Sequence, residues 1–146
     1  MKFLSSIGLL SASLAVAQGT PGEFLFAVSK FQAGATPHSS VGHVSFDLSF
    51  GSGDSSTSCS ARPPAYQSFP SINQAPCEDT TASFNLTMSS DGADLEIWQG
   101  GEPGVFVRGT HHITSKEIVW ANEQSPTGRV QVYQGAQDFT IKATTV

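Results

Sequence analysis

The sequence is poor in positive charge and in charged residues of any kind. Seven Lys and Arg residues stand against twelve Asp and Glu residues, and charged residues make up only 13% of the chain. The few cations are scattered, so no basic stripe could follow the phosphates of a nucleic acid, and an acidic chain is repelled by anionic lipid surfaces. We therefore expect neither a nucleic-acid partner nor a membrane partner.

The sequence also lacks an apolar run of the roughly 20 residues that a membrane-spanning helix needs. The apolar stretch after Lys2 is "FLSSIGLLSASLAV" (residues 3–16), and "AVA" at 15–17 fits the small residues of a signal-peptide cleavage site. We expect residues 1–17 to be a removed signal peptide of a secreted protein; a membrane anchor is the alternative, which the short run disfavours. Residues 18–146 are enough for a single domain with one core.

Cysteine is scarce, with Cys59 and Cys77 as the two examples. In a secreted chain an even number of cysteines indicates disulfide bonding, and two cysteines allow a single connectivity. Two free buried thiols are the alternative. A metal site at the cysteines is disfavoured, because no histidine lies close to either of them in the sequence.

Helical periodicity is missing, and an alternation of period two takes its place. "VSFDLSF" (44–50) alternates cleanly, and "ASFNLTM" (82–88) predicts an inward face that includes Met88. In "FLFAVSKF" (24–31) the alternation places Phe26 and Val28 on one face and Phe31 on the other. Further strands are expected in "DLEIW", "VFVRG", "EIVWA", "RVQVYQ" and "FTIKA".

Turn-forming residues separate these strands, and Asp91-Gly92 predicts a tight hairpin. About eight short strands with regular turns indicate an all-β domain, which we expect to be an antiparallel β-barrel, with a β-sandwich as the alternative. The proline-rich segment "ARPPAYQSFPSINQAP" (61–76) has no period. We predict that it is a loop with both ends held by the Cys59–Cys77 bridge.

The order of the elements resembles the secreted fungal family of the Alternaria major allergen. The resemblance rests on "SKFQAGATPHSS", "VGHVSFDLSF", "TSCSA", "PCEDTTASFNLTMSSDGADLEIWQ" and "VQVYQGAQDFTIKA", in this order. It implies a small β-barrel in which Cys59 and Cys77 form the family's first internal disulfide. The family's second internal pair and its intersubunit cysteine have no counterpart here, so a monomer or a non-covalent dimer is expected.

The resemblance also implies a function. Several members of the family are effectors or elicitors that act on plants, and none has an established enzymatic activity. We therefore expect a non-enzymatic, allergen-like protein that binds a host extracellular protein in the apoplast or at the fungal cell wall and affects virulence or defence. A carbohydrate- or small-ligand-binding barrel is the alternative, and a secreted hydrolase ranks third.

The stretch "TPHSSVGHVSF" (36–46), followed by Asp47, contains the residue types of a nucleophilic triad. His43 and Asp47 share a strand face but lie about 13 Å apart at the usual strand rise, too far for a hydrogen bond. His38 follows a proline in an expected turn, and no G-x-S-x-G elbow occurs in the sequence. We predict no catalytic residue here.

Metal, copper-oxidase and glycosidase chemistry are also disfavoured. His38 and His43 could meet His111 or His112, but adjacent strand residues point to opposite faces, so the last two cannot both bind one metal. A copper-dependent polysaccharide oxidase needs histidine as the first mature residue. The expected first mature residue here is Gln18, so this activity is disfavoured. The acidic pairs Asp94/Glu96 and Glu117/Glu123 show no sign of a facing arrangement. We expect no metal and no cofactor.

Two further predictions concern the surface. Asn85-Leu86-Thr87 is an N-x-T acceptor on the polar face of a strand, which makes Asn85 a candidate for glycosylation. Trp98 falls on the same strand face as Asp94 and Glu96, and exposed aromatic side chains dominate the energetics of many interfaces. We therefore expect Trp98, Tyr66 and Phe69 as candidate partner-binding residues, with packing in the core as the alternative.

Overall fold

The computed structural model describes residues 23–50, 56–100, 106–121 and 129–146. The expected signal peptide and Glu123 lie outside these ranges. The described residues form a 3₁₀ turn, η1 (Ser115–Glu117), and the strands β1 (Glu23–Ala35), β2 (Gly42–Phe50), β3 (Ser56–Ala61), β4 (Ile72–Pro76), β5 (Ala82–Ser89), β6 (Gly92–Gly100), β7 (Phe106–Thr114), β8 (Ile118–Ala121), β9 (Val130–Tyr133) and β10 (Phe139–Thr145). A search of the described residues for a helix long and apolar enough to cross a membrane finds none.

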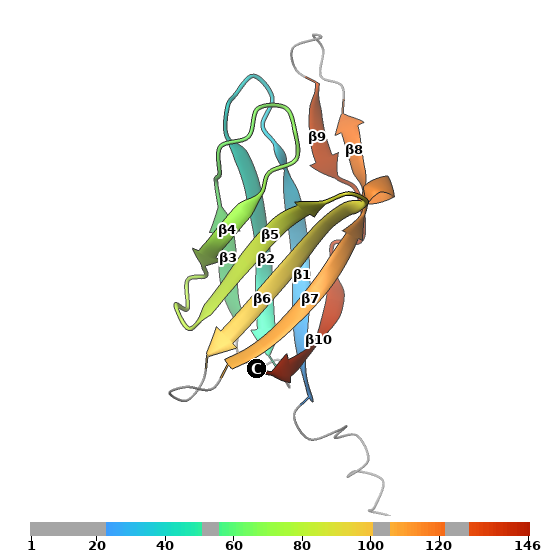
Figure 1. The fold of residues 1–146 in the computed structure, drawn as a ribbon. Coiled ribbons are helices and arrows are strands. Elements are labelled where there is room, and N and C mark those ends of the chain that lie inside the picture. Colours follow the sequence, from blue (N-terminus) through green and yellow to red (C-terminus); the bar gives the residue numbers. More distant parts are fainter. Residues whose placement is uncertain (1–22, 51–55, 101–105, 122–128) are drawn as a thin grey trace, which may run out of the picture.

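Eight of the strands form a nearly closed antiparallel barrel, in the order β3-β2-β1-β10-β7-β6-β5-β4. β8 and β9 form a hairpin outside this path, which is joined to β1 where Gly34 pairs with Val132. Figure 1 shows this hairpin standing above the barrel wall. The prediction of an antiparallel β-barrel is thus confirmed.

The disulfide closes the barrel where its two edge strands meet. Cys59 of β3 and Cys77, which follows β4, form an isolated bridge and are covalently linked, with their Cα atoms 4.1 Å apart. Two hydrogen bonds cross the same seam: the Glu78 amide donates to the Ser58 carbonyl at 2.8 Å, and the Asp79 amide donates to Thr57 Oγ1 at 2.8 Å. The predicted bridge is confirmed, and its place shows that it joins the edges of the sheet.

The core lies inside the barrel and follows the predicted alternation in β2, β5 and β6. Phe46 and Phe84 are buried and meet edge to face across the interior, with ring centroids 5.1 Å apart. Met88, which the alternation predicts to be inward, is 43% exposed. It lies one residue before the turn that connects β5 to β6, so its side chain projects beyond the end of the core.

A β-bulge in β1 corrects the predicted faces of this strand. Its pairing with β2 shifts between Ser29 and Gln32, and Lys30 has a left-handed backbone with φ of 57°. Because a bulge adds one residue to one strand, the inward positions change from even to odd numbers. Phe31 is therefore fully buried and does not lie on the outer face.

Part of the predicted loop 61–76 is a strand. β4 pairs with β5 at the edge of the sheet, the place in a sheet where a proline such as Pro76 is tolerated. A register shift between Ile72 and Ala75, with Gln74 at φ of 71°, breaks the alternation that would have revealed the strand.

Candidate functional site

The stretch 36–46 forms a corner between β1 and β2, as predicted. Residues 37–40 form the turn, and the Val41 amide donates to Ser39 Oγ at 3.1 Å. His38 is exposed at φ of 56°. Asp47 accepts a hydrogen bond from Ser58 Oγ at 3.1 Å and lies 3.7 Å from Lys30 Nζ. Asp47 thus interacts with Ser58 and Lys30 and not with His43, so the stretch contains no Ser-His-Asp arrangement.

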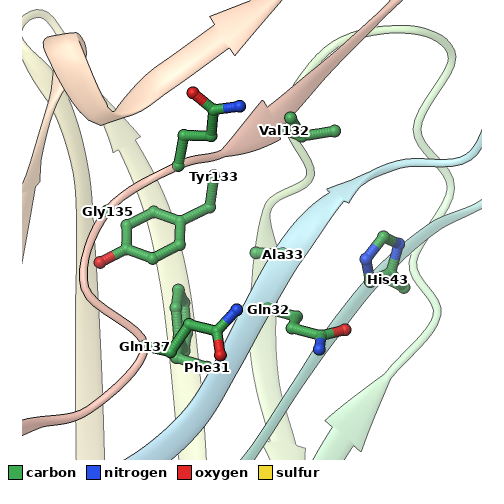
Figure 2. A pocket seen from close by; sticks show the side chains of 9 residues that line it. Phe31, Gln32, Ala33, His43, Val132, Tyr133, Gly135 and Gln137 are labelled. Carbon is green, nitrogen blue, oxygen red and sulfur yellow. The ribbon is translucent and has the colours of Figure 1, made fainter. Parts of the chain in front are cut away.

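His43 lines a surface groove of about 420 Å³ between β1, β2 and β9. Figure 2 shows its imidazole facing the groove across from Gln32 and Gln137. Partial burial, and next the charge of Arg62, lower the pKa of His43, so the imidazole is neutral near pH 7. The sequence did not predict this groove, because its residues come from three distant parts of the chain.

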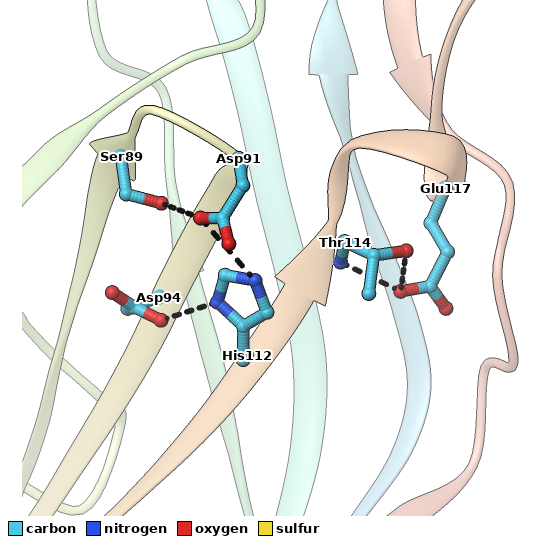
Figure 3. Close-up of polar contacts among 6 residues, drawn as sticks. All are labelled: Ser89, Asp91, Asp94, His112, Thr114 and Glu117. Atoms are coloured by element: carbon cyan, nitrogen blue, oxygen red, sulfur yellow. Dashed lines mark hydrogen bonds and ion pairs between the residues drawn. The ribbon is translucent and has the colours of Figure 1, made fainter.

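His111 and His112 point to opposite sides of β7, as the alternation predicts. His111 stacks on Phe139 with ring centroids 4.0 Å apart, and its burial lowers its pKa. His112 lies on the outer face between two carboxylates. Its Nδ1 is 2.7 Å from Asp94 Oδ1 and its Nε2 is 3.6 Å from Asp91 Oδ1, and the hydrogen bond to Asp94 raises its pKa (Figure 3).

Ser89 completes this row of residues but does not make it a catalytic triad. Its hydroxyl donates to Asp91 Oδ1 at 3.2 Å, so the hydroxyl faces a carboxylate and not the imidazole. A serine nucleophile needs a base within hydrogen-bond reach of its oxygen. Ser89, Asp91, Asp94 and His112 therefore form an exposed charge cluster between the β5–β6 hairpin and β7 (Figure 3).

The candidate metal and glycosidase residues also have other partners. Glu117 Oε1 accepts hydrogen bonds from the amide of Thr114 at 2.9 Å and from its hydroxyl at 3.2 Å (Figure 3). Asp94 is paired with His112, and Glu96 interacts with side chains of β5, β6 and β7. Within the described ranges, no group of three or more His, Cys, Asp or Glu side chains could hold a metal ion.

Glu96 organises the outer face of β5, β6 and β7. Its Oε1 accepts hydrogen bonds from Asn85 Nδ2 at 3.1 Å and from Trp98 Nε1 at 3.0 Å, and its Oε2 lies 3.7 Å from Arg108 Nε. The guanidinium of Arg108 lies 5.2 Å from the centroid of the Trp98 ring. Phe106, also on this side of the sheet, is 48% exposed. We call these five residues the Trp98 face.

Strand register explains why these side chains meet. Asn85 pairs with Glu96, and Trp98 pairs with Arg108, so partners from three strands lie directly beside each other. Side chains of directly opposed residues are close enough to interact. The alternation placed Trp98 on the face of Glu96 correctly, but Arg108 could not be assigned to it without the register.

The other predicted partner-binding residues do not belong to the Trp98 face. Tyr66 is 66% exposed in the segment between β3 and β4, which Figure 1 shows at the opposite end of the barrel from the end of β6. Phe69, in the same segment, is 5% exposed and packs in the core, and its amide donates to Gln131 Oε1 at 2.8 Å. Phe69 therefore offers almost no surface to a partner.

The candidate glycosylation site lies at the edge of the Trp98 face. Asn85 is half-buried, and its Oδ1 is shielded from solvent with no hydrogen-bond partner among the described residues. Its Nδ2, the atom that would carry a glycan, donates to Glu96. Glycosylation of Asn85 stays a prediction.

Comparisons with known proteins agree with the architecture. No protein-family model and no curated protein matches the sequence. Among solved structures, the crystal structure of the Alternaria alternata major allergen Alt a 1 matches with a TM-score of 0.58 and 18% identity, over 87% of this chain and 98% of the allergen chain. The chain therefore has the β-barrel fold of that allergen.

Proposed function

We propose that this protein is a secreted fungal interaction protein without enzymatic activity, of the effector or elicitor type, that binds a host extracellular protein. The allergen-like fold and the disulfide are compatible with an extracellular protein. The resemblance of the sequence motifs to the family of the Alternaria major allergen suggests that the partner is a host protein. We infer that the Trp98 face is the surface that contacts this partner.

The Trp98 face has the composition and rigidity of a binding surface. Trp and Arg are enriched among residues that dominate the energetics of protein interfaces. Here the indole is fixed by Glu96, and Arg108 rests against the ring while its side chain keeps 47% of its surface exposed. Side chains held in place before binding lose less conformational entropy when a partner arrives.

The same pairing disfavours chemistry at this surface. Glu96 accepts hydrogen bonds from Asn85 and Trp98 and faces the positive charge of Arg108. A glycosidase needs a second carboxylate facing the first across the scissile bond, whereas Glu96 faces a guanidinium and two hydrogen-bond donors. Asp94, the acid nearest to Glu96 on this strand face, is engaged with His112.

Affinity capture tests the proposal. The purified protein is immobilised and exposed to extracellular fluid from plant leaves, and a captured protein is purified and its Kd measured. We expect Trp98→Ala to raise this Kd roughly 30-fold, since truncation of a central interface residue costs about 2 kcal/mol or more. Arg108→Ala should act in the same direction.

Trp120 provides a matched control for this experiment. Trp120 lies on β8 and is 45% exposed. Like Trp98, it has an arginine over its ring, with the Arg129 guanidinium 4.6 Å from the ring centroid. Trp120→Ala should leave the Kd unchanged if the Trp98 face makes the contact. Failure to capture any host protein, or equal losses in the two tryptophan variants, would contradict the proposal.

A further inference from the structure

The groove beside His43 is a second surface with the features of a binding site. It has a volume of about 420 Å³, within the usual range for small-ligand sites. β1, β2, β9 and the segment after β9 form its walls (Figure 2). The side chains that line it include Gln32, His43, Val132, Tyr133, Gln134 and Gln137.

The three glutamine side chains of the groove carry no charge and have free amide groups within the described part of the chain. No hydrogen bond of the Gln32, Gln134 or Gln137 side-chain amides to another described residue is found. Each amide offers two donors and an acceptor oxygen, and the neutral imidazole of His43 offers one donor and one acceptor. None of the described residues that line the groove is Lys, Arg, Asp or Glu; the charges of Arg62 and Glu117 act on His43 and Tyr133 from outside this lining. This set suits a ligand with many hydroxyl groups and no charge.

The segment that carries Gln134 and Gln137 is held in place from several sides. The Tyr133 hydroxyl donates to the Ala136 carbonyl at 2.6 Å, and the backbone N–H of Gln134 donates to the backbone carbonyl of Glu117 at 2.7 Å. The Phe31 amide, within the β1 bulge, donates to the Gln137 carbonyl at 3.0 Å. Because the backbone of this segment is fixed, binding has to order only the glutamine side chains, which lowers the entropic cost of binding.

Gly135 allows this tight packing. A Cβ atom at this position would collide with the Tyr133 hydroxyl and with Glu117 Oε2. The bulge and the glycine therefore shape one wall of the groove together. Bulges of this kind occur preferentially beside functional sites.

The groove also has an apolar part. Val132 lies on one side, and the Tyr133 ring is fixed edge to face against Phe31, with centroids 4.9 Å apart at 87°. An aromatic ring next to convergent amides can cover the C–H face of a sugar while the amides bind its hydroxyls.

We propose that this groove binds a neutral oligosaccharide. An anionic or cationic ligand would find no charge of opposite sign in the lining, and a lipid chain would leave the amides without partners. The site uses β1, β2 and β9, whereas the Trp98 face uses β5, β6 and β7. The inference is thus independent of the protein partner proposed above.

The test is a titration of ¹⁵N-labelled full-length mature protein with neutral hexasaccharides of glucose and of N-acetylglucosamine, and with hexagalacturonic acid as the charged counterpart. We expect a neutral sugar to shift the side-chain amide resonances of Gln32, Gln134 and Gln137, and the acidic sugar to leave them unchanged. Gln134→Ala/Gln137→Ala should weaken binding by about tenfold for each amide lost.

Asn73→Ala is the matched control, because it removes an exposed amide on β4, a strand that contributes no residue to the groove. It should bind the sugar as the unaltered protein does. Unchanged backbone resonances outside the groove show that the double variant is folded. The proposal is overturned if no neutral sugar shifts the three glutamines at millimolar concentration, if the double variant keeps full affinity, or if the shifts fall on Trp98.

Discussion

Single residues on the outer face of β5, β6 and β7 act through partners on neighbouring strands. Glu96 gathers Asn85, Trp98 and Arg108, and Asp94 holds His112 at 2.7 Å. Apart from Glu96 and Trp98, which share β6, each of these pairs depends on the register between consecutive strands. Alternation alone could predict which side chains share a face, as it did for Trp98 and Glu96, but not which ones touch.

The residue-scale prediction concerns His112 and pH. Its hydrogen bond to Asp94, with further help from the charge of Asp91, raises its folded pKa above the ordinary value of 6.5. A raised folded pKa means that protonation favours the folded state. The stabilisation is fully present below about pH 6.5 and is lost as the pH rises through the folded pKa. His112→Gln should therefore lower the Tm more at pH 5.5 than at pH 8.5.

Thermal melts of the two proteins at both pH values measure this difference. His43, whose pKa is lowered by burial, is present in both proteins, so its contribution cancels. The His111 pKa, which burial lowers most, is also lowered by the charge of His112, and the variant removes this smaller effect. His38→Asn, a change at an exposed turn position that tolerates positive φ, serves as the control. A Tm difference for His112→Gln that is the same at both pH values would contradict the assignment.

Whole strands show where sequence patterns succeed and fail. β2 and β5 follow a regular alternation, and their positions and, apart from Met88, their inward faces were predicted. β1 and β4 contain irregularities at Lys30 and Gln74, both with positive φ. One extra residue reverses the faces of β1, and the short β4 is hidden within a proline-rich segment. A glycine in the sequence often marks a position with positive φ, but Lys and Gln do not. The bulge in β1 and the irregular strand β4 were therefore not predicted.

The element-scale prediction concerns the seam between β3 and β4. Cys59 and Cys77 are 18 residues apart in sequence, and a bridge over a loop of this length stabilises a protein by about 3 kcal/mol on the chain-entropy model. Cys59→Ser/Cys77→Ser should lower the free energy of unfolding by roughly this amount. Two hydrogen bonds, one between backbone groups and one to the Thr57 hydroxyl, still join the seam, so secondary structure at low temperature should be unchanged.

Urea unfolding followed by circular dichroism measures both quantities. Reduction of the unaltered protein should reproduce the loss seen in the serine variant, since both open the same link. An unfolding midpoint equal to that of the oxidised protein would show that the bridge does not stabilise the seam.

At the scale of the whole molecule, the sequence predicted the barrel but not the arrangement of its surfaces. Fold class followed from strand period and turn residues, which are local properties. The groove requires β1, β2 and β9 to meet, and the place of the β8–β9 hairpin beside Gly34 depends on long-range pairing. The Trp98 face likewise requires the order β5-β6-β7. The structure thus separates one candidate protein contact from one candidate sugar contact.

The central claim, that the protein acts by binding a host protein through the Trp98 face, can be tested with its own two tryptophans. Trp98 and Trp120 are the two tryptophans of the chain, so a ¹⁵N-labelled sample gives two indole N–H signals, which Trp120→Phe assigns. On addition of the protein captured from host extracellular fluid, we expect the Trp98 signal to shift or broaden, because its N–H is bonded to Glu96 at the contact. The Trp120 signal should stay unchanged. A complex that forms while the Trp98 signal remains in place would contradict the claim.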